Sequence, residues 1–309
     1  MIDRHDCVYV AGHGGMVGSA LLRRLQARGH DHFLTRTRAE LDLLDQAAVY
    51  DFLAEEQPHY VFVAAARVGG IEANDSLRAD FLFENLQIAT NLIQGAHRAG
   101  IQHLMFLSSN CVYPRECAQP MAESALLTGP LEPTNEPYAI AKIAAMKLCE
   151  SHQRQHGRRY VSVLPASLYG PNDNYEPGSS HVLPALLRRA HEASERGDEE
   201  LVIWGSGTPR REFVHVDDLA EACVMLAETG YDGPPLNIGS GSDISIRELA
   251  GMVADVVGFR GRLVFDTSKP DGIARKLLDS SRIDALGWRP TTRLIDGLRR
   301  TYASAPFRA

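Results

Sequence analysis

The chain has 309 residues, of which 44% are hydrophobic and 23% are charged. This composition is typical of a globular protein, and the length predicts two domains or one large α/β domain with an insertion. The formal net charge of −7 argues against nucleic acid as the main partner. The first residues do not resemble a signal peptide, and the apolar run 60–71 is too short to span a bilayer, so we expect no membrane partner.

Five cysteines, an odd number without a C-x-x-C pair, indicate free thiols. We therefore expect a cytoplasmic protein with no disulfide framework and no metal site. Cys7, Cys149 and Cys223 lie in apolar-periodic segments and are expected in the core, whereas Cys111 lies elsewhere.

Short apolar runs alternate with amphipathic stretches over about the first 165 residues. Predicted strands cover 7–11, 32–35, 60–64, 104–107 and 160–164. A predicted helix with an apolar face from 17 to 25 follows the first strand, and others lie near 46–57, 77–98 and 138–156. This alternation predicts right-handed βαβ crossovers and a doubly wound parallel sheet of the Rossmann type, covered on both faces.

The pattern changes after Pro165, where glycine and proline cluster at 170–178. Further elements are predicted as a helix near 181–195, strands at 201–204 and 213–216, a helix from Asp217, and a strand at 236–238 that could join the first sheet. Ser245 and Glu248 have the spacing of a capping box, which predicts a helix to about 257. We therefore expect one domain over 1–165 that also uses about 213–240, and a smaller α/β domain over 166–309 interleaved with it.

A glycine-rich segment joins the first strand to the first helix, with glycines at 12, 15 and 18. This spacing allows a tight turn, close approach of the backbone to a pyrophosphate, and packing of the helix on the strand. The helix N-terminus would stabilise the phosphate charge. We predict that a dinucleotide cofactor binds to this loop, which consists of Gly12, His13, Gly14, Gly15, Met16, Val17 and Gly18.

The end of the second predicted strand indicates which dinucleotide is bound. NAD enzymes favour an acidic residue there to hold the ribose 2′-hydroxyl. This chain has Arg36 and Arg38 instead, and arginine suits the 2′-phosphate of NADP. The sequence thus favours NADP(H), the alternative being two solvated surface arginines.

Tyr138 and Lys142 are four residues apart in a predicted helix, which places the phenol and the ammonium on one face. A neighbouring ammonium stabilises phenolate, so the tyrosine could donate a proton to a forming alkoxide. Ser109 follows the predicted strand 104–107 at its carboxyl end, where parallel sheets bind ligands, and its hydroxyl could hydrogen-bond the same oxygen.

These residues resemble the extended short-chain dehydrogenase/reductase family. Within it, the chain is similar to the NADPH-dependent 3,5-epimerase/4-reductases that convert GDP-4-keto-6-deoxy-D-mannose to GDP-L-fucose. The resemblance runs from about residue 7 to about 290. It is carried by GHGGMVGSA (12–20), AAARVGGI (64–71), SSNCVYP (108–114), EPTNEPYAIAKIA (132–144), SLYGPNDNY (167–175), SSHVLPALLRR (179–189), WGSGTPRREFVHVDD (204–218) and KPDGIARKLLD (269–279).

The resemblance implies that Cys111 is the base and His181 the acid of epimerisation, while Tyr138, Lys142 and Ser109 serve the reduction. The alternatives are a buried structural thiol at Cys111 and an ordinary helix-start residue at His181. Implied cofactor contacts also include Leu107, Ser108, Ser109, Asn110, Tyr138, Lys142, Pro165, Ala166, Ser167, Leu168 and His181. Implied GDP-sugar contacts are Arg189, Trp204, Arg211, Asp271 and Lys276.

The resemblance also implies a homodimer, formed through the helices near 77–98 and 138–156. The chain departs from it at Gly14, where bacterial relatives usually have arginine, and at Asn110, where the family often has serine or threonine. Two other functions remain open. One is a related epimerase/reductase acting on a sugar of the GDP-colitose or GDP-heptose type, and the other is a non-catalytic NADP-binding sensor.

Overall fold

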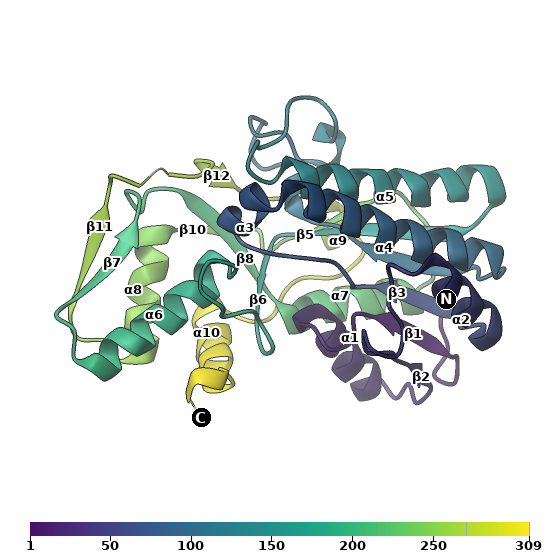
Figure 1. Cartoon of the computed structure of the whole chain (residues 1–309), viewed down its shortest axis with the longest axis horizontal. Coiled ribbons are helices and arrows are strands. Elements are labelled where there is room, and N and C mark those ends of the chain that lie inside the picture. The colour runs from purple at the N-terminus through teal and green to yellow at the C-terminus, as the bar shows by residue number, and fades with distance from the viewer. Residues whose placement is uncertain (270, 309) are drawn as a thin grey trace.

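The first region of the chain forms a six-stranded parallel sheet with the order β2-β1-β3-β4-β5-β9. The computed structural model describes residues 1–269 and 271–308 (Figure 1). The strands of this sheet are β1 (Val8–Ala11), β2 (Phe33–Leu34), β3 (Tyr60–Val63), β4 (His103–Leu107), β5 (Arg159–Pro165) and β9 (Leu236–Ile238). The predicted doubly wound parallel sheet is confirmed, and the segment 236–238 joins it beside β5.

Helices cover both faces of this sheet. They are α1 (Met16–Ala27), α2 (Gln46–Glu56), α3 (Ile71–Ser76), α4 (Arg78–Arg98), α5 (Glu136–His156) and α7 (Val216–Glu228). On one face α4 packs against both α2 and α5, and on the other α1 packs against α7 (Figure 1). Every residue of β1 and β3 is buried, as expected for strands covered on both sides.

The second region is built from short strands that come from distant parts of the chain. In one sheet β8 (Arg210–His215) pairs with β6 (Ser167–Tyr169), β10 (Asp243–Ser245) and β12 (Arg275–Lys276). A two-stranded sheet joins β7 (Glu200–Trp204) to β11 (Arg262–Asp266). The remaining helices are α6 (Val182–Arg196), α8 (Ile246–Val257), α9 (Ser281–Ala285) and α10 (Leu294–Ala303), and the short 3₁₀ turns are η1 (Asn110–Val112), η2 (Glu123–Ala125) and η3 (Pro306–Arg308).

A second hydrophobic core lies where α8 packs against α6 and α10. Its fully buried members include Leu187, Ala190, Leu249 and Val253. The capping box predicted at Ser245 and Glu248 is present, and it begins α8 as expected.

Several elements differ from the sequence expectation. The helix expected near 77–98 is preceded by the separate helix α3, and the short elements β6, β10, β11, β12, α9 and α10 were not predicted. Cys149 and Cys223 are buried, but Cys7 is only half-buried. Among the described residues, no helix combines the length and the apolar character needed to cross a membrane.

Candidate active site at the carboxyl edge of the parallel sheet

The turn between β1 and α1 requires glycine at two positions. Gly12 has φ +83°, and a Cβ atom there would lie 2.8 Å from the backbone of Ala65 on the neighbouring β3 segment. A Cβ atom at Gly18 would overlap the carbonyl of Gly12, so only glycine lets α1 begin this close to β1. At Gly14, in contrast, a Cβ atom would meet no atom within 4 Å.

This turn presents free donors to a ligand. Gly15 caps α1 in an extended conformation, no side chain caps the helix, and its first turn contains no acidic residue. The first amide groups of α1 are thus available to an anion. Two buried polar atoms, His13 Nδ1 in this turn and Ser108 Oγ directly after β4, have no hydrogen-bond partner within the described residues. Buried polar groups normally have partners, and a bound nucleotide would supply them, so these residues fit a dinucleotide cofactor.

Arg36 and Arg38 follow β2 but differ in their surroundings. The Arg36 guanidinium forms an ion pair of 2.5 Å with Glu56 and lies 5.0 Å from the centre of the Phe52 ring. Arg38 is exposed. Glu40, which the sequence analysis did not single out, closes the same loop by accepting hydrogen bonds from the amide and hydroxyl of Thr37. A 2′-phosphate would therefore meet an exposed Arg38 and an Arg36 that is already paired with Glu56.

Tyr138 and Lys142 lie in the first turns of α5, beside the end of β4. Lys142 donates a hydrogen bond of 2.8 Å to the carbonyl of Leu107, and its Nζ lies 5.6 Å from the centre of the Tyr138 ring. Burial lowers the pKa of Lys142 to about 8, and burial raises the pKa of Tyr138. Burial is thus the largest cause of both pKa shifts.

Cys111 is buried in η1, directly after β4. Its amide hydrogen-bonds to the Ser109 hydroxyl, which caps this turn. Burial raises the pKa of the Cys111 thiol, while Ser109 and the cations Lys276 and Lys142 act in the opposite direction. The charge of Cys111 in turn raises the pKa of Tyr138, which places the thiol beside the tyrosine and both lysines.

His181 is the N-cap residue of α6 and remains exposed. Its pKa is lowered by the protein packed around the ring and by the Lys276 cation. Lys276 lies on β12, and burial and the charge of Arg211 lower its pKa. The charge of Lys276 thus acts on both His181 and Cys111, so the two residues implied in epimerisation lie near one side chain from the second region.

The other predicted cofactor contacts lie at or shortly after the carboxyl ends of β4 and β5. Leu107 ends β4, Pro165 ends β5, and Ser167 and Leu168 lie in β6. The amide of Ala166 hydrogen-bonds to the carbonyl of Ile238. Asn110 is buried in η1. This matches the rule that ligands bind outside the carboxyl ends of the strands in an open α/β sheet.

The predicted substrate residues form two groups. Burial lowers the pKa of Arg211, and the nearby Asp271 carboxylate acts in the opposite direction. The charge of Arg211 also acts on Lys276, and Arg211 donates a hydrogen bond of 2.6 Å to the carbonyl of Ile273. Asp271 accepts hydrogen bonds from the amide and hydroxyl of Ser206. Part of the hydrogen-bonding capacity of its carboxylate is therefore already used to hold the loop that contains Ser206.

The other group lies on α6 and β7. Arg189 hydrogen-bonds to the carbonyl of Val202, and Trp204 is 63% exposed. The Lys269 ammonium lies 5.5 Å from the Trp204 ring. No polar contact that the structure describes joins this group to Arg211 or Lys276.

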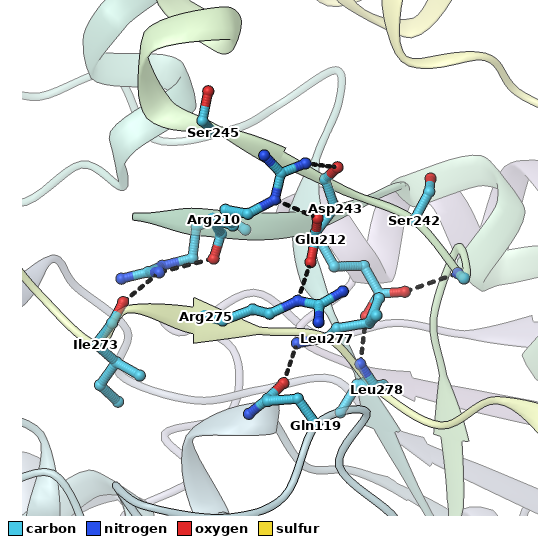
Figure 2. Close-up of polar contacts among 12 residues, drawn as sticks. Gln119, Arg210, Glu212, Ser242, Asp243, Ser245, Ile273, Arg275, Leu277 and Leu278 are labelled. Atoms are coloured by element: carbon cyan, nitrogen blue, oxygen red, sulfur yellow. Dashed lines mark hydrogen bonds and ion pairs between the residues drawn. The ribbon is translucent and has the colours of Figure 1, made fainter. Parts of the chain in front are cut away.

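The strand that carries Lys276 is held by buried acids that the sequence analysis did not single out. Glu212 is 1% exposed, and it accepts hydrogen bonds of 2.8 Å from the amides of Leu278 and Gly241 (Figure 2). Asp243 binds Arg210 and Arg275, which ties β10 to β8 and β12. Glu212 lies within the quoted REFVHVDD string, but its partners lie 29 and 66 residues away, so no local spacing indicates its role.

A second missed residue is Asn85, which shapes the loop after β3. Its side chain accepts a hydrogen bond from the amide of Arg67 and donates to the carbonyls of Arg67 and Phe81. Its only sequence signal is an amide in an otherwise apolar helix face.

Comparison with known proteins adds a further line of evidence. The chain matches the NAD dependent epimerase/dehydratase family over residues 8–239. It is 54% identical to GDP-L-fucose synthase 1 of Arabidopsis thaliana over 98% of this chain and 94% of the relative. It is also 54% identical to GDP-L-fucose synthase of Escherichia coli (strain K12), over 96% of this chain and 95% of the relative. A solved structure of a GDP-mannoheptose C4 reductase from Campylobacter jejuni with NADP bound has a TM-score of 0.91 at 38% identity, covering 98% of this chain and 99% of that one.

Proposed function

Because the chain belongs to the NAD dependent epimerase/dehydratase family, and within it to the GDP-L-fucose synthases, we propose that it converts GDP-4-keto-6-deoxy-D-mannose to GDP-L-fucose with NADPH. The protein is an oxidoreductase with epimerase activity, and its cofactor is a nicotinamide dinucleotide. The choice of NADPH is supported by Arg36 and Arg38 after β2 and by the NADP bound in the C. jejuni reductase.

For the reduction, the chain supplies a proton and stabilises negative charge. When bound, NADPH supplies a hydride to C4 of the sugar. Tyr138 donates its phenolic proton to the C4 oxygen, and the Lys142 ammonium stabilises the phenolate that remains. The Ser109 hydroxyl donates a hydrogen bond to the same oxygen, at the end of β4 where the cofactor and the sugar would meet.

For the epimerisation, the chain moves protons at C3 and C5, next to the C4 ketone. The Cys111 thiolate removes each proton, which leaves an enolate, and His181 returns a proton to the opposite face. Lys276 lies close enough to both groups to shift their pKa values, so its ammonium stabilises the thiolate and the enolate. Arg211 binds the diphosphate of the GDP-sugar from the neighbouring strand.

The proposal rests on one observation, the proximity of Cys111, Tyr138, Lys142, His181 and Lys276, which lie close enough for their charges to act on one another in pairs. A non-catalytic sensor has no need of this arrangement. The test is an NADPH-oxidation assay with GDP-4-keto-6-deoxy-D-mannose, followed by NMR of the product. GDP-L-fucose is expected, and an absence of turnover with this substrate would contradict the proposal.

A related 4-keto sugar of the GDP-colitose or GDP-heptose type is the second candidate. The catalytic residues would serve it equally, but identity falls from 54% for the GDP-L-fucose synthases to 38% for the heptose reductase. Turnover compared across these 4-keto sugars separates the two candidates. We also propose a homodimer through α4 and α5, because Phe83 and Ile140 on these helices are exposed apolar residues. Sedimentation at working concentration tests this proposal, and a 34 kDa particle would contradict it.

A further inference from the structure

Three histidines meet at the C-terminal ends of α4 and α5. His97 lies in the last turn of α4, and His152 and His156 lie four residues apart at the end of α5, on one face of that helix. The centre of the His97 ring is 4.5 Å from that of His152 and 4.4 Å from that of His156. One ring nitrogen of each lies within 4.8 Å of those of the other two.

The central ring has polar atoms with nothing to bind. His152 is only 6% exposed, and neither of its ring nitrogens has a hydrogen-bond partner within the described residues. Burying an imidazole without partners costs free energy, and most buried polar side-chain atoms have at least one. An ion between the three rings would supply the missing partner.

We propose that His97, His152 and His156 form a binding site for a divalent transition-metal ion of the Zn²⁺ type, with water as the fourth ligand. Three imidazoles and an open position make up a known zinc coordination set. In a tetrahedral site with Zn–N distances of about 2.0–2.1 Å, the nitrogens lie about 3.3 Å apart. The observed separations of up to 4.8 Å must therefore shorten when the ion binds.

The electrostatics of the two helix ends favour a cation. Both helices end at the cluster, α4 at Arg98 and α5 at His156, and helix C-termini carry partial negative charge.

The Arg158 side chain competes with a metal ion for His97, so a variant at this position tests the proposal. Its Nε donates a hydrogen bond of 3.2 Å to Nδ1 of His97. A metal bound through Nδ1 displaces this bond, and a metal bound through Nε2 requires a proton on Nδ1, which removes the acceptor. Arg158 and the ion therefore compete for His97, in addition to the repulsion between their charges.

The site would be structural rather than catalytic. The cluster lies beside the start of β4, where Arg158 also binds Gly100 and Gln102, whereas the catalytic residues follow the ends of the strands. The cysteine spacing gave no reason to expect a metal site, and this cluster contains no cysteine. An ion here would tie the ends of α4 and α5 together without altering turnover.

The test uses the full chain, stripped with a chelator and titrated with Zn²⁺ by calorimetry. One equivalent is expected to bind, and the melting temperature is expected to rise with zinc concentration because the ion binds the folded state. The exposed variant His156→Ala should lose at least about 100-fold in affinity, since even outer-shell partners of a metal contribute about 10- to 100-fold. The matched control is His59→Ala, which removes an exposed histidine stacked on His103 and should bind zinc normally.

Two further measurements separate a metal site from a packing cluster. Arg158→Gln should bind zinc more tightly while the metal-free protein becomes less stable, whereas a purely structural cluster would only lose stability. Co²⁺ should give the visible spectrum of a nitrogen-ligated site without thiolate charge transfer, which excludes binding at Cys111. The proposal is overturned if the full chain binds no stoichiometric Zn²⁺, or if His156→Ala binds it as the unaltered chain does. Neither result bears on the GDP-sugar activity, because NADPH oxidation is measured separately.

Discussion

The two regions of the molecule place their reactive side chains by different means. In the first region, Ser109, Cys111, Tyr138 and Lys142 follow the end of β4 or begin α5, so each position is set by a local strand end or helix start. In the second region, Lys276 lies on a two-residue strand that is held by Glu212, a residue 64–66 positions earlier in the chain. The position of a reactive side chain can be predicted from residue spacing where local structure determines it. Where residues distant in the sequence determine it, the three-dimensional structure is needed.

Removal of the proton donor of the first region should have the largest effect on activity. Tyr138→Phe should lower kcat for ketone reduction by about 10²- to 10⁴-fold, the usual contribution of a positioned acid. NADPH binding should change little, because the ring remains. Stopped-flow NADPH oxidation measures the effect, and Tyr50→Phe, on the surface of α2, is the matched control. A loss below tenfold would remove Tyr138 from the donor role.

Cys111→Ser tests the neighbouring base. A hydroxyl is far less acidic than a thiol, so solvent deuterium incorporation at C3 and C5 should fall by at least about 100-fold while substrate still binds. Mass spectrometry of the recovered sugar nucleotide measures the exchange. Cys117→Ser, in the same segment and half-buried, should exchange normally. Normal exchange in the Cys111 variant would leave this residue a buried structural thiol.

The pH dependence of turnover tests whether Cys111 and Lys142 act as one coupled pair. Catalysis requires the thiolate together with the ammonium, yet burial lowers the pKa of Lys142 to about 8 and raises that of Cys111 above its ordinary value. Below about pH 8 both groups hold protons, so kcat/KM should rise about tenfold per pH unit towards that value.

At still higher pH the pair loses its second proton, and kcat/KM should fall again. The maximum should therefore lie above pH 8. A profile that is flat from pH 6 to 10 would show that the pair does not limit the reaction. Lys142→Arg keeps the positive charge throughout this range. If this variant retains activity, its pH profile should lack the change in kcat/KM near pH 8.

Glu212→Gln tests the second region. The carboxylate accepts hydrogen bonds from the amides of Ser240, Gly241 and Leu278, and an amide side chain has only one oxygen to replace them. The variant should lose about 1–3 kcal/mol in free energy of unfolding, and KM for the sugar nucleotide should rise by roughly tenfold as β12 shifts. The Kd for NADPH should stay unchanged. Glu199→Gln, exposed in the same region, is the control, and an equal loss of NADPH affinity would contradict the division between regions.

Predictions from the sequence were most accurate where the structure is local. The order of strands and helices to about residue 165, the strand 236–238 and the capping box at Ser245 followed from periodicity and spacing. Strands of two or three residues, such as β10 and β12, contain too few side chains to show alternation, so they were missed. Glu212 and the His97 cluster were missed because their partners are brought together only by the fold.

The prediction that Arg36 binds the 2′-phosphate was limited in the same way, although this residue lies in the first region. Two arginines after β2 indicated a 2′-phosphate site, and the spacing alone showed no competitor. The structure pairs Arg36 with Glu56, 20 residues later on α2, and stacks it on Phe52. A side chain from the next helix thus alters what a local motif predicts.

Gly14→Arg tests how far the pairing of Arg36 with Glu56 weakens the preference for NADPH over NADH. A Cβ atom at Gly14 meets nothing within 4 Å, so the larger side chain fits without moving the turn. If its guanidinium reaches the 2′-phosphate, it adds an ion pair that at a solvated site is worth up to about 1 kcal/mol, or about fivefold in affinity. The Kd for NADPH should fall by that factor and the Kd for NADH should not, as fluorescence titration would show, with Gly14→Ala as the control. An equal gain for both cofactors would mean that the new charge contacts the pyrophosphate, and that Arg36 and Arg38 already provide the discrimination.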